Sequence, residues 1–247
     1  MMRTVLGAFS FLTVVRTAAD SVAPGRAAIF FPLVGAVLGA AGAGIYLGAS
    51  RALPLSLASL ATVAFWAAIS GVLHEDGLAD VADALRAGRT QEKMLAILKD
   101  SRVGTFGVVA VVFSVLARWQ ALEHLSAPRG NVEIWEILIA SQAFPRAGMV
   151  ALAWVSRPVG TGLGLAFSST LTTSGALIAI GQGIVAALVC GLRAGLTLIV
   201  GGYLIIRLMR AYFYRRIGGV NGDCLGATEQ LLEVFVLVLF TCGECAW

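Results

Sequence analysis

The chain has 247 residues, of which 58% are hydrophobic and only 13% are charged, and its mean hydropathy is +0.87. A soluble domain carries about 25% charged residues, so this composition excludes a soluble fold. The net charge of +4 does not indicate nucleic-acid binding, because the arginines fall between apolar segments and form no basic face. We predict a single all-α, polytopic membrane domain over residues 1–247.

The apolar segments are expected in the following order. Residues 6–15 are too few to cross a bilayer and lack a convincing signal-peptide cleavage site, so they predict an N-terminal interfacial or re-entrant segment. Spanning runs of about 20 residues begin near Ile29, Leu53, Val103 and Ile134. Residues 177–206 hold two shorter spans broken around residues 191–195, and a last span starts near Leu231. The total is about seven transmembrane helices.

Basic residues set the expected orientation. With the N-terminus in the cytoplasm, thirteen Lys and Arg residues lie in inside loops, against Arg51, Arg129 and Arg193 outside. The positive-inside rule favours this topology in a cell inner membrane. Residues 74–102 and 207–229 then both face the cytoplasm, so a site built from them would face the cytoplasm too.

Some residues inside the apolar runs also carry expectations. Arg118 lies near a span end and is expected to extend its side chain to the membrane surface. Arg146 lies in the middle of a span, where a lone cation requires an acidic partner or a substrate phosphate. The glycines of the first long span predict close helix packing, within one chain or between copies in a homo-oligomer; they are Gly35, Gly39, Gly42, Gly44 and Gly48.

An acidic cluster is the main functional signal. Asp76, Asp80 and Asp83 are spaced i, i+4, i+7, which places three carboxylates on one helix face beside an apolar segment. Their mutual repulsion would be relieved by a hard divalent cation, with Mg²⁺ or Mn²⁺ favoured by oxygen ligands. The alternative is a solvated acidic face at a helix start, which accounts for one or two acids but less well for three.

Two further stretches indicate phosphate chemistry. Residues 99–102 combine Lys99, Asp100, Ser101 and Arg102, which could bind phosphate beside a metal or cap the next helix. In the second stretch, residues 215–229, four residues are predicted to bind substrate: Arg215, Asn221, Asp223 and Glu229. Arg146 joins this set as a cation for the leaving group. Asp76, Asp80, Asp83 and Asp100 are the predicted metal ligands and catalytic residues, and one of them could accept the proton of the nucleophile.

Four motifs in order resemble the cobalamin synthase family, adenosylcobinamide-GDP ribazoletransferase. They are FPLVG at residues 31–35, LHEDGLADVADAL at 73–85, KDSRVGTFG at 99–107 and GDCLGATE at 222–229. The resemblance implies that the hydroxyl or phosphate end of α-ribazole, or of its 5′-phosphate, attacks the β-phosphorus of adenosylcobinamide-GDP. GMP leaves, and adenosylcobalamin or its phosphate forms.

The resemblance also implies a Mg²⁺ cofactor and assigns residues to it. Asp76, Gly77, Asp80 and Asp83 would form the metal site, while Asp100, Arg102 and Asp223 would hold a second metal or phosphate. Two positions depart from the expected pattern: Glu75 replaces an apolar residue and Ala84 replaces glycine. Neither departure removes a carboxylate.

Other membrane proteins use similar acids. CDP-alcohol phosphotransferases also begin a motif with Asp-Gly, but their next acids follow at longer spacing than Asp80 does here. Intramembrane prenyltransferases have two aspartate-rich motifs, whereas the second half of this chain has only Asp223. A cation-coupled transporter would place acids at mid-membrane and not at the loop boundaries where these acids are predicted.

Overall fold

The computed structural model describes residues 1–19, 22–100, 102–125 and 132–242. These residues form helices and no β-strand, which confirms the all-α prediction. The elements are α1 (Met2–Leu12), α2 (Pro24–Ala27), the 3₁₀ helix η1 (Ala28–Phe30), α3 (Phe31–Ala49), α4 (Leu55–Ser70), α5 (Leu73–Ala87), α6 (Gln91–Ile97), α7 (Thr105–His124), α8 (Ile134–Trp154), α9 (Leu163–Thr170), α10 (Thr173–Val189), α11 (Leu192–Ile217) and α12 (Gly222–Leu239).

The helices agree with a polytopic membrane protein. Within the described ranges, four helical segments are long and apolar enough to span a bilayer: residues 24–49, 105–124, 134–154 and 192–217. Two bent pairs, α4 with α5 and α9 with α10, raise the number to six if each pair forms one span. That number is below the predicted seven. The last predicted span, α12, is not among them and carries three acids, Asp223, Glu229 and Glu233.

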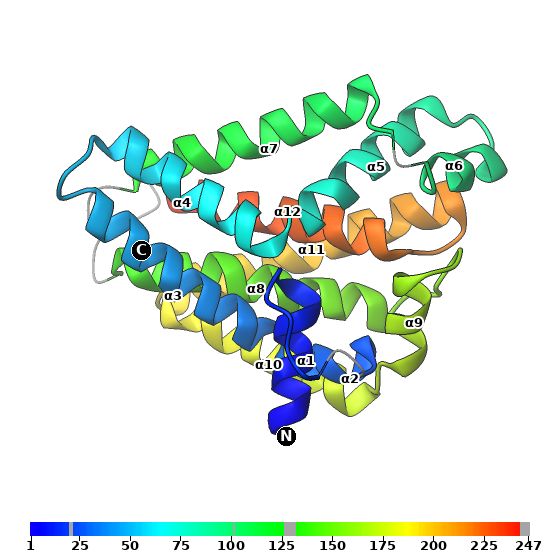
Figure 1. Cartoon of the computed structure of the whole chain (residues 1–247), viewed down its shortest axis with the longest axis horizontal. Coiled ribbons are helices and arrows are strands. Elements are labelled where there is room, and N and C mark those ends of the chain that lie inside the picture. The colour runs from blue at the N-terminus through cyan, green and yellow to red at the C-terminus, as the bar shows by residue number, and fades with distance from the viewer. Residues whose placement is uncertain (20–21, 101, 126–131, 243–247) are drawn as a thin grey trace.

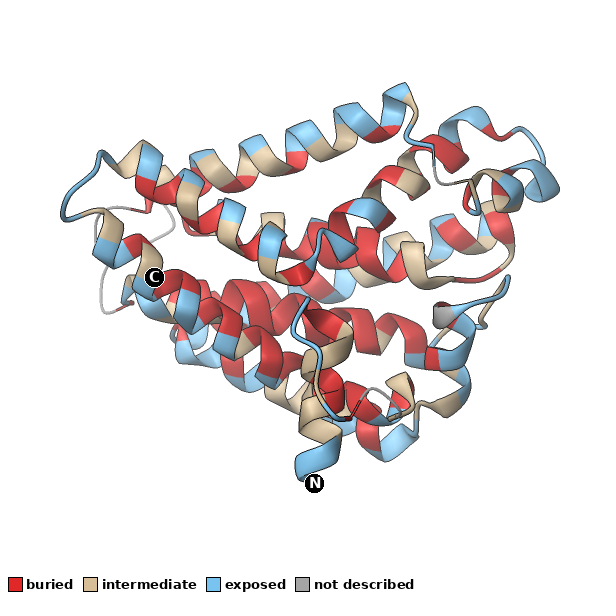
Figure 2. Cartoon of the chain, viewed as in Figure 1, coloured by how far each residue is buried: buried red, intermediate tan, exposed pale blue. Residues whose placement is uncertain are grey.

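The centre of the molecule is α8, which packs against α3, α10 and α12 and is mostly buried (Figures 1 and 2). Glycines permit the close approach of α3. A Cβ atom at Gly35 or Gly39 would lie 2.2 Å or 2.4 Å from a backbone carbonyl oxygen of α8. The packing prediction is therefore confirmed for these two glycines and for Gly42, which contacts Trp66, whereas Gly44 and Gly48 have open space around them.

A sharp turn redirects the chain between α4 and α5. The two helices meet at 86°, and Gly71 and Val72 both adopt left-handed backbone conformations, with φ of +61° and +53°. The conformation is strained for Val72, because a β-branched side chain clashes with its own backbone there. The turn carries α5, with all the acids of the cluster, away from α4 and onto α12.

Hydrogen bonds from side chains to backbone carbonyls join the ends of α5, α6 and α11. Arg216, at the end of α11, donates to the carbonyl oxygens of Leu85 and Gly88 at the end of α5. Gln91, the first residue of α6, donates to the carbonyl of Ile217. These contacts place the loop after α6 and the loop before α12 at the same end of the molecule.

Candidate active site

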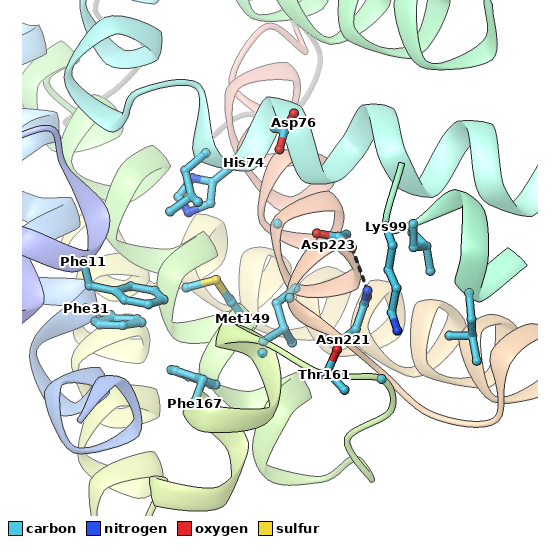
Figure 3. A pocket seen from close by; sticks show the side chains of 18 residues that line it. Phe11, Phe31, His74, Asp76, Lys99, Met149, Thr161, Phe167, Asn221 and Asp223 are labelled. Carbon is cyan, nitrogen blue, oxygen red and sulfur yellow. Dashed lines mark hydrogen bonds between the residues drawn. The ribbon is translucent and has the colours of Figure 1, made fainter. Parts of the chain in front are cut away.

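A cavity of about 340 Å³ opens where α5 crosses α12. Its lining combines acidic, basic and apolar side chains from segments far apart in the sequence. Figure 3 shows Asp76, Asp223, Asn221 and Lys99 on one side, and phenylalanines on the other. The volume falls within the range of about 300–1,000 Å³ typical of small-molecule sites.

Glycine determines how closely the two acidic helices approach. A Cβ atom at Gly77 of α5 would lie 3.0 Å from the carbonyl oxygen of Asp223 and 3.1 Å from its Cα atom. On the opposite helix, Gly226 lies against the backbone of His74. The glycine of the Asp-Gly motif therefore serves to bring the carboxylates of α5 beside Asp223.

Five aspartates lie near one another in the structure, and two of them, Asp76 and Asp223, line the cavity. Asp76, Asp83, Asp100 and Asp223 each lie close enough to Asp80 to repel its negative charge. They come from α5, the loop after α6 and the first turn of α12. The sixth aspartate of the chain, Asp20, lies outside the described residues. The positive-inside rule predicts that residues 74–102 and 207–229 lie on the same side of the membrane. The packing of α5 against α12 is what brings their aspartates close together.

Asp83 binds backbone amides. Its Oδ2 accepts a hydrogen bond of 2.6 Å from the N–H of Gly104, and its Oδ1 accepts one of 2.9 Å from Gly107. A Cβ atom on Gly104 or Gly107 would lie 2.5 Å or 2.4 Å from these oxygens, so a side chain at either position would displace the carboxylate. Asp83, predicted as a metal ligand, thus anchors the N-terminus of α7, where a carboxylate satisfies free amides and opposes the helix dipole.

The stretch after α6 divides into two parts. Lys99 lines the cavity, as expected for a phosphate-binding cation. Asp100 pairs with Arg102 through a 2.6 Å contact, and this partner lowers the pKa of the Asp100 carboxyl to about 2. The side chain of Arg102 is 87% exposed, so the pair lies at the surface. Ser101, predicted to bind substrate, lies outside the described residues.

The residues before and within α12 have different surroundings. Asn221 caps the helix by accepting a 3.0 Å hydrogen bond from the N–H of Cys224, and it donates a 2.6 Å bond to Asp223 Oδ2. This contact orients the Asp223 carboxylate at the cavity (Figure 3). Arg215, a predicted substrate ligand, is exposed, whereas its neighbour Arg216 forms the contacts with α5.

Arg118 is buried in the helix bundle, so the expectation that it reaches the membrane surface is wrong. Its side chain is 1% exposed and lies 2.9 Å from Glu75 Oε1 and 3.3 Å from Glu233 Oε1. Glu75, noted above as a departure from the family pattern, is buried and pairs with Arg118. Two glutamates on separate helices satisfy the cation, and no sequence period relates them to Arg118.

A second buried group lies beside the first. Arg146 Nη1 is 3.1 Å from Glu229 Oε1, and the other oxygen of Glu229 is 3.1 Å from His74 Nδ1. The partner that Arg146 requires is thus Glu229, and both residues, predicted to bind substrate, are almost fully buried. Of the three, His74 lines the cavity, and its Nε2 has no hydrogen-bond partner within the described part of the chain.

The carboxylates fit Mg²⁺ only as a partial coordination shell. Among the residues that the structure describes, no group of three or more His, Cys, Asp or Glu side chains is arranged to hold a metal ion. Mg²⁺ does not require such a group, because proteins commonly bind it through one or two carboxylates while substrate phosphates and water complete the octahedron. Asp76, Asp80 and Asp223 remain after the partners of Asp83 and Asp100 are assigned, and one or two of them could supply the carboxylates of that mode.

Comparison with known proteins identifies the family. A model of the cobalamin-5-phosphate synthase family matches residues 4–241. The chain is 35% identical to an adenosylcobinamide-GDP ribazoletransferase of Ralstonia pickettii, with 99% of this chain and 94% of the relative covered. It is 38% identical to the enzyme of that name from Bradyrhizobium diazoefficiens, with 94% and 90% covered. No solved structure matches the chain.

These matches cover nearly the whole chain and confirm the family that the four motifs indicated. The chain therefore belongs to the cobalamin-5-phosphate synthase family and is a membrane-embedded transferase of cobalamin synthesis.

Proposed function

We propose that the protein joins α-ribazole, or its 5′-phosphate, to adenosylcobinamide-GDP. A ribose hydroxyl attacks the phosphorus nearest to cobinamide, and the bond from this phosphorus to the bridging oxygen breaks. GMP leaves with that oxygen, the hydroxyl proton is released, and adenosylcobalamin or its phosphate forms. The observation that carries the proposal is the cavity itself, where aspartates of two helices and a lysine surround a space of nucleoside size.

In this proposal the polar end of the cavity holds the diphosphate. One or two of the carboxylates of Asp76, Asp80 and Asp223 would bind Mg²⁺, which neutralises phosphate charge when it is bound. Lys99 lines the same end and supplies a positive charge for the phosphate oxygens. Asn221 holds the Asp223 carboxylate in place through its 2.6 Å hydrogen bond. Phosphoryl transfer depends mostly on such positioning and charge neutralisation.

The other residues that were predicted to bind metal or substrate support the site and do not contact the phosphates themselves. Asp83 fixes the start of α7, and Arg102 pairs with Asp100 at the surface, next to Lys99 in the chain. Arg146 and Glu229 keep His74 at the cavity wall. These roles agree with their burial and partners, because a side chain whose charge is already paired has less capacity to bind a substrate.

We further propose that the site faces the cytoplasm across an inner membrane. The contacts of Arg216 with α5 and of Gln91 with Ile217 support this proposal, because they bring the two arginine-rich segments to the end of the molecule that carries the cavity. Soluble nucleotide substrates would then reach the site directly. Protease accessibility of tagged loops in sealed vesicles of known orientation would test this topology.

The transferase reaction is testable with purified protein in liposomes. Mass spectrometry should detect GMP and a cobalamin product in equal amounts after addition of adenosylcobinamide-GDP, α-ribazole and Mg²⁺. Chelation should stop the reaction and added Mg²⁺ should restore it. Asp76→Asn and Asp223→Asn should each lose most of the turnover, whereas Glu92→Gln, an exposed carboxylate on α6, should keep it. Transport of substrate without release of a nucleotide would contradict the proposal.

A further inference from the structure

A second cavity, which we call the outer groove, is bounded by α8, α10 and α11 and has a volume of about 530 Å³. Its α8 residues, among them Ala147 and Ala151, lie on the helix face opposite Met149, which lines the candidate active site. In the part of the chain that the structure describes, Arg207 and Arg210 are the only charged side chains in the lining. The outer groove is therefore a separate site, apolar along its length and basic at one end.

The length of the outer groove matches one leaflet of a bilayer. Its lining runs from Phe144 to Val155 on α8 and from Ile199 to Arg210 on α11, and both helices are long and apolar enough to span a membrane. Each stretch covers 11 helical rises of 1.5 Å, or about 16 Å. Half of a hydrocarbon core of about 30 Å is about 15 Å. A lipid acyl chain that enters from one membrane surface would thus lie along the whole groove.

The two arginines at the end of the outer groove are held in place without an acidic partner. Arg210 Nε donates a 2.9 Å hydrogen bond to the carbonyl oxygen of Val155, and its guanidinium lies 4.4 Å from the ring centroid of Tyr214. The guanidinium of Arg207, one turn earlier, lies 5.9 Å from the ring centroid of Tyr203. Neither arginine forms an ion pair with any residue that the structure describes. Since a guanidinium has five N–H donors, most of them are available to an anion.

We propose that the outer groove binds an anionic phospholipid, with one acyl chain along the groove and the headgroup phosphate at Arg207 and Arg210. Charge complementarity selects this ligand, because basic pockets between transmembrane helices bind anionic headgroups. A zwitterionic phospholipid would place its own ammonium group beside two guanidinium groups, and an uncharged lipid would leave both arginines without a counter-ion. The proposal depends on the membrane character of the protein and is independent of the transferase reaction.

Native mass spectrometry of the full chain released from detergent would test the headgroup site. It would compare the affinities for phosphatidylglycerol and phosphatidylcholine that carry the same acyl chains. The wild-type protein should bind phosphatidylglycerol about 10–30-fold more tightly, as expected for two arginines near one phosphate. The double variant Arg207→Gln with Arg210→Gln should reduce this preference to about twofold or less. Arg89→Gln with Lys93→Gln is the matched control: it removes the same charge from exposed positions outside the groove and should keep the preference.

A second pair of variants tests the acyl-chain site. Ala151→Phe places a ring in the groove while both arginines remain, so it should weaken phosphatidylglycerol binding about tenfold by excluding several methylene groups. Val185→Phe adds a ring to an exposed position of α10 outside the groove and should leave binding unchanged.

Three results would overturn the proposal. The first is equal affinity of the wild-type protein for the two phospholipids. The second is an equal loss of preference in the two double variants, because the basic surface as a whole would then attract the lipid. The third is full phosphatidylglycerol binding by a folded Ala151→Phe protein, because no acyl chain would then occupy the groove. Melting temperatures in phosphatidylcholine nanodiscs show which variants fold, and the arginine variants decide by themselves if Ala151→Phe does not.

Discussion

Replacing Asp83 by asparagine separates an anchoring role from a metal-binding role. In the structure both oxygens of Asp83 accept backbone N–H groups, at 2.6 Å from Gly104 and 2.9 Å from Gly107. Asparagine keeps one acceptor and turns an NH₂ group toward the other amide. One charge-assisted hydrogen bond is lost at a buried position, which costs about 1.5–3 kcal/mol. For a chain of this size the melting temperature should fall by roughly 3–12 °C.

The matched variant is Asp80→Asn. Asp80 lies on the same helix and is surrounded by like charges, so its neutralisation should leave the melting temperature unchanged or raise it. It should abolish turnover, because it removes a proposed Mg²⁺ ligand. Differential scanning fluorimetry on protein in nanodiscs, followed by Mg²⁺ titration of GMP release, measures both effects.

The two variants should therefore respond in opposite ways. Asp83→Asn should lose stability while the Mg²⁺ concentration for half-maximal activity stays the same. A variant at Asp83 with wild-type stability and a raised Mg²⁺ requirement would refute the anchoring role and restore Asp83 as a ligand.

Three further changes test the packing around the site. Gly77→Val should lower turnover strongly by separating α5 from α12. Gly44→Val is the control and should have little effect, because no atom lies within 4 Å of a Cβ there. Equal activity in both variants would contradict a role for the close α5–α12 contact at Gly77. Arg118→Met should cost about 3–5 kcal/mol by leaving two buried glutamates unpaired, and unfolding in SDS would show whether it does. Val72→Asn should stabilise the protein by about 1 kcal/mol, because asparagine tolerates the left-handed conformation better; an unchanged or lowered melting temperature would argue against strain at this turn.

Local patterns in the chain accounted for much of the fold and part of the site. Apolar runs near Ile29, Leu53, Val103 and Ile134 became α3, α4, α7 and α8, because about 20 apolar residues have few alternatives to a helix in a bilayer. The break expected at residues 191–195 falls at Gly191, where φ is +92°.

Contacts between residues far apart in the sequence were not predicted. The spacing of Asp76, Asp80 and Asp83 placed three acids on one helix, but it could not show that two glycines of another segment would engage Asp83. The prediction that the Arg118 side chain reaches the membrane surface was wrong for the same reason. Its partners Glu75 and Glu233 lie 43 and 115 residues from it along the chain. The departure at Glu75 was the one local signal that could have indicated a buried ion pair.

The sequence by itself determined the class of protein, the helical segments, the aspartate cluster and the family. These properties depend on composition and on spacing along single helices, which short-range geometry controls. Only the tertiary structure decided which acids are paired, because the partners of Asp83 and Glu75 come from other segments of the chain. The crossing of α5 and α12 at Gly77, and the phenylalanines contributed by α1, α3 and α9, likewise depend on packing between segments that no local pattern relates.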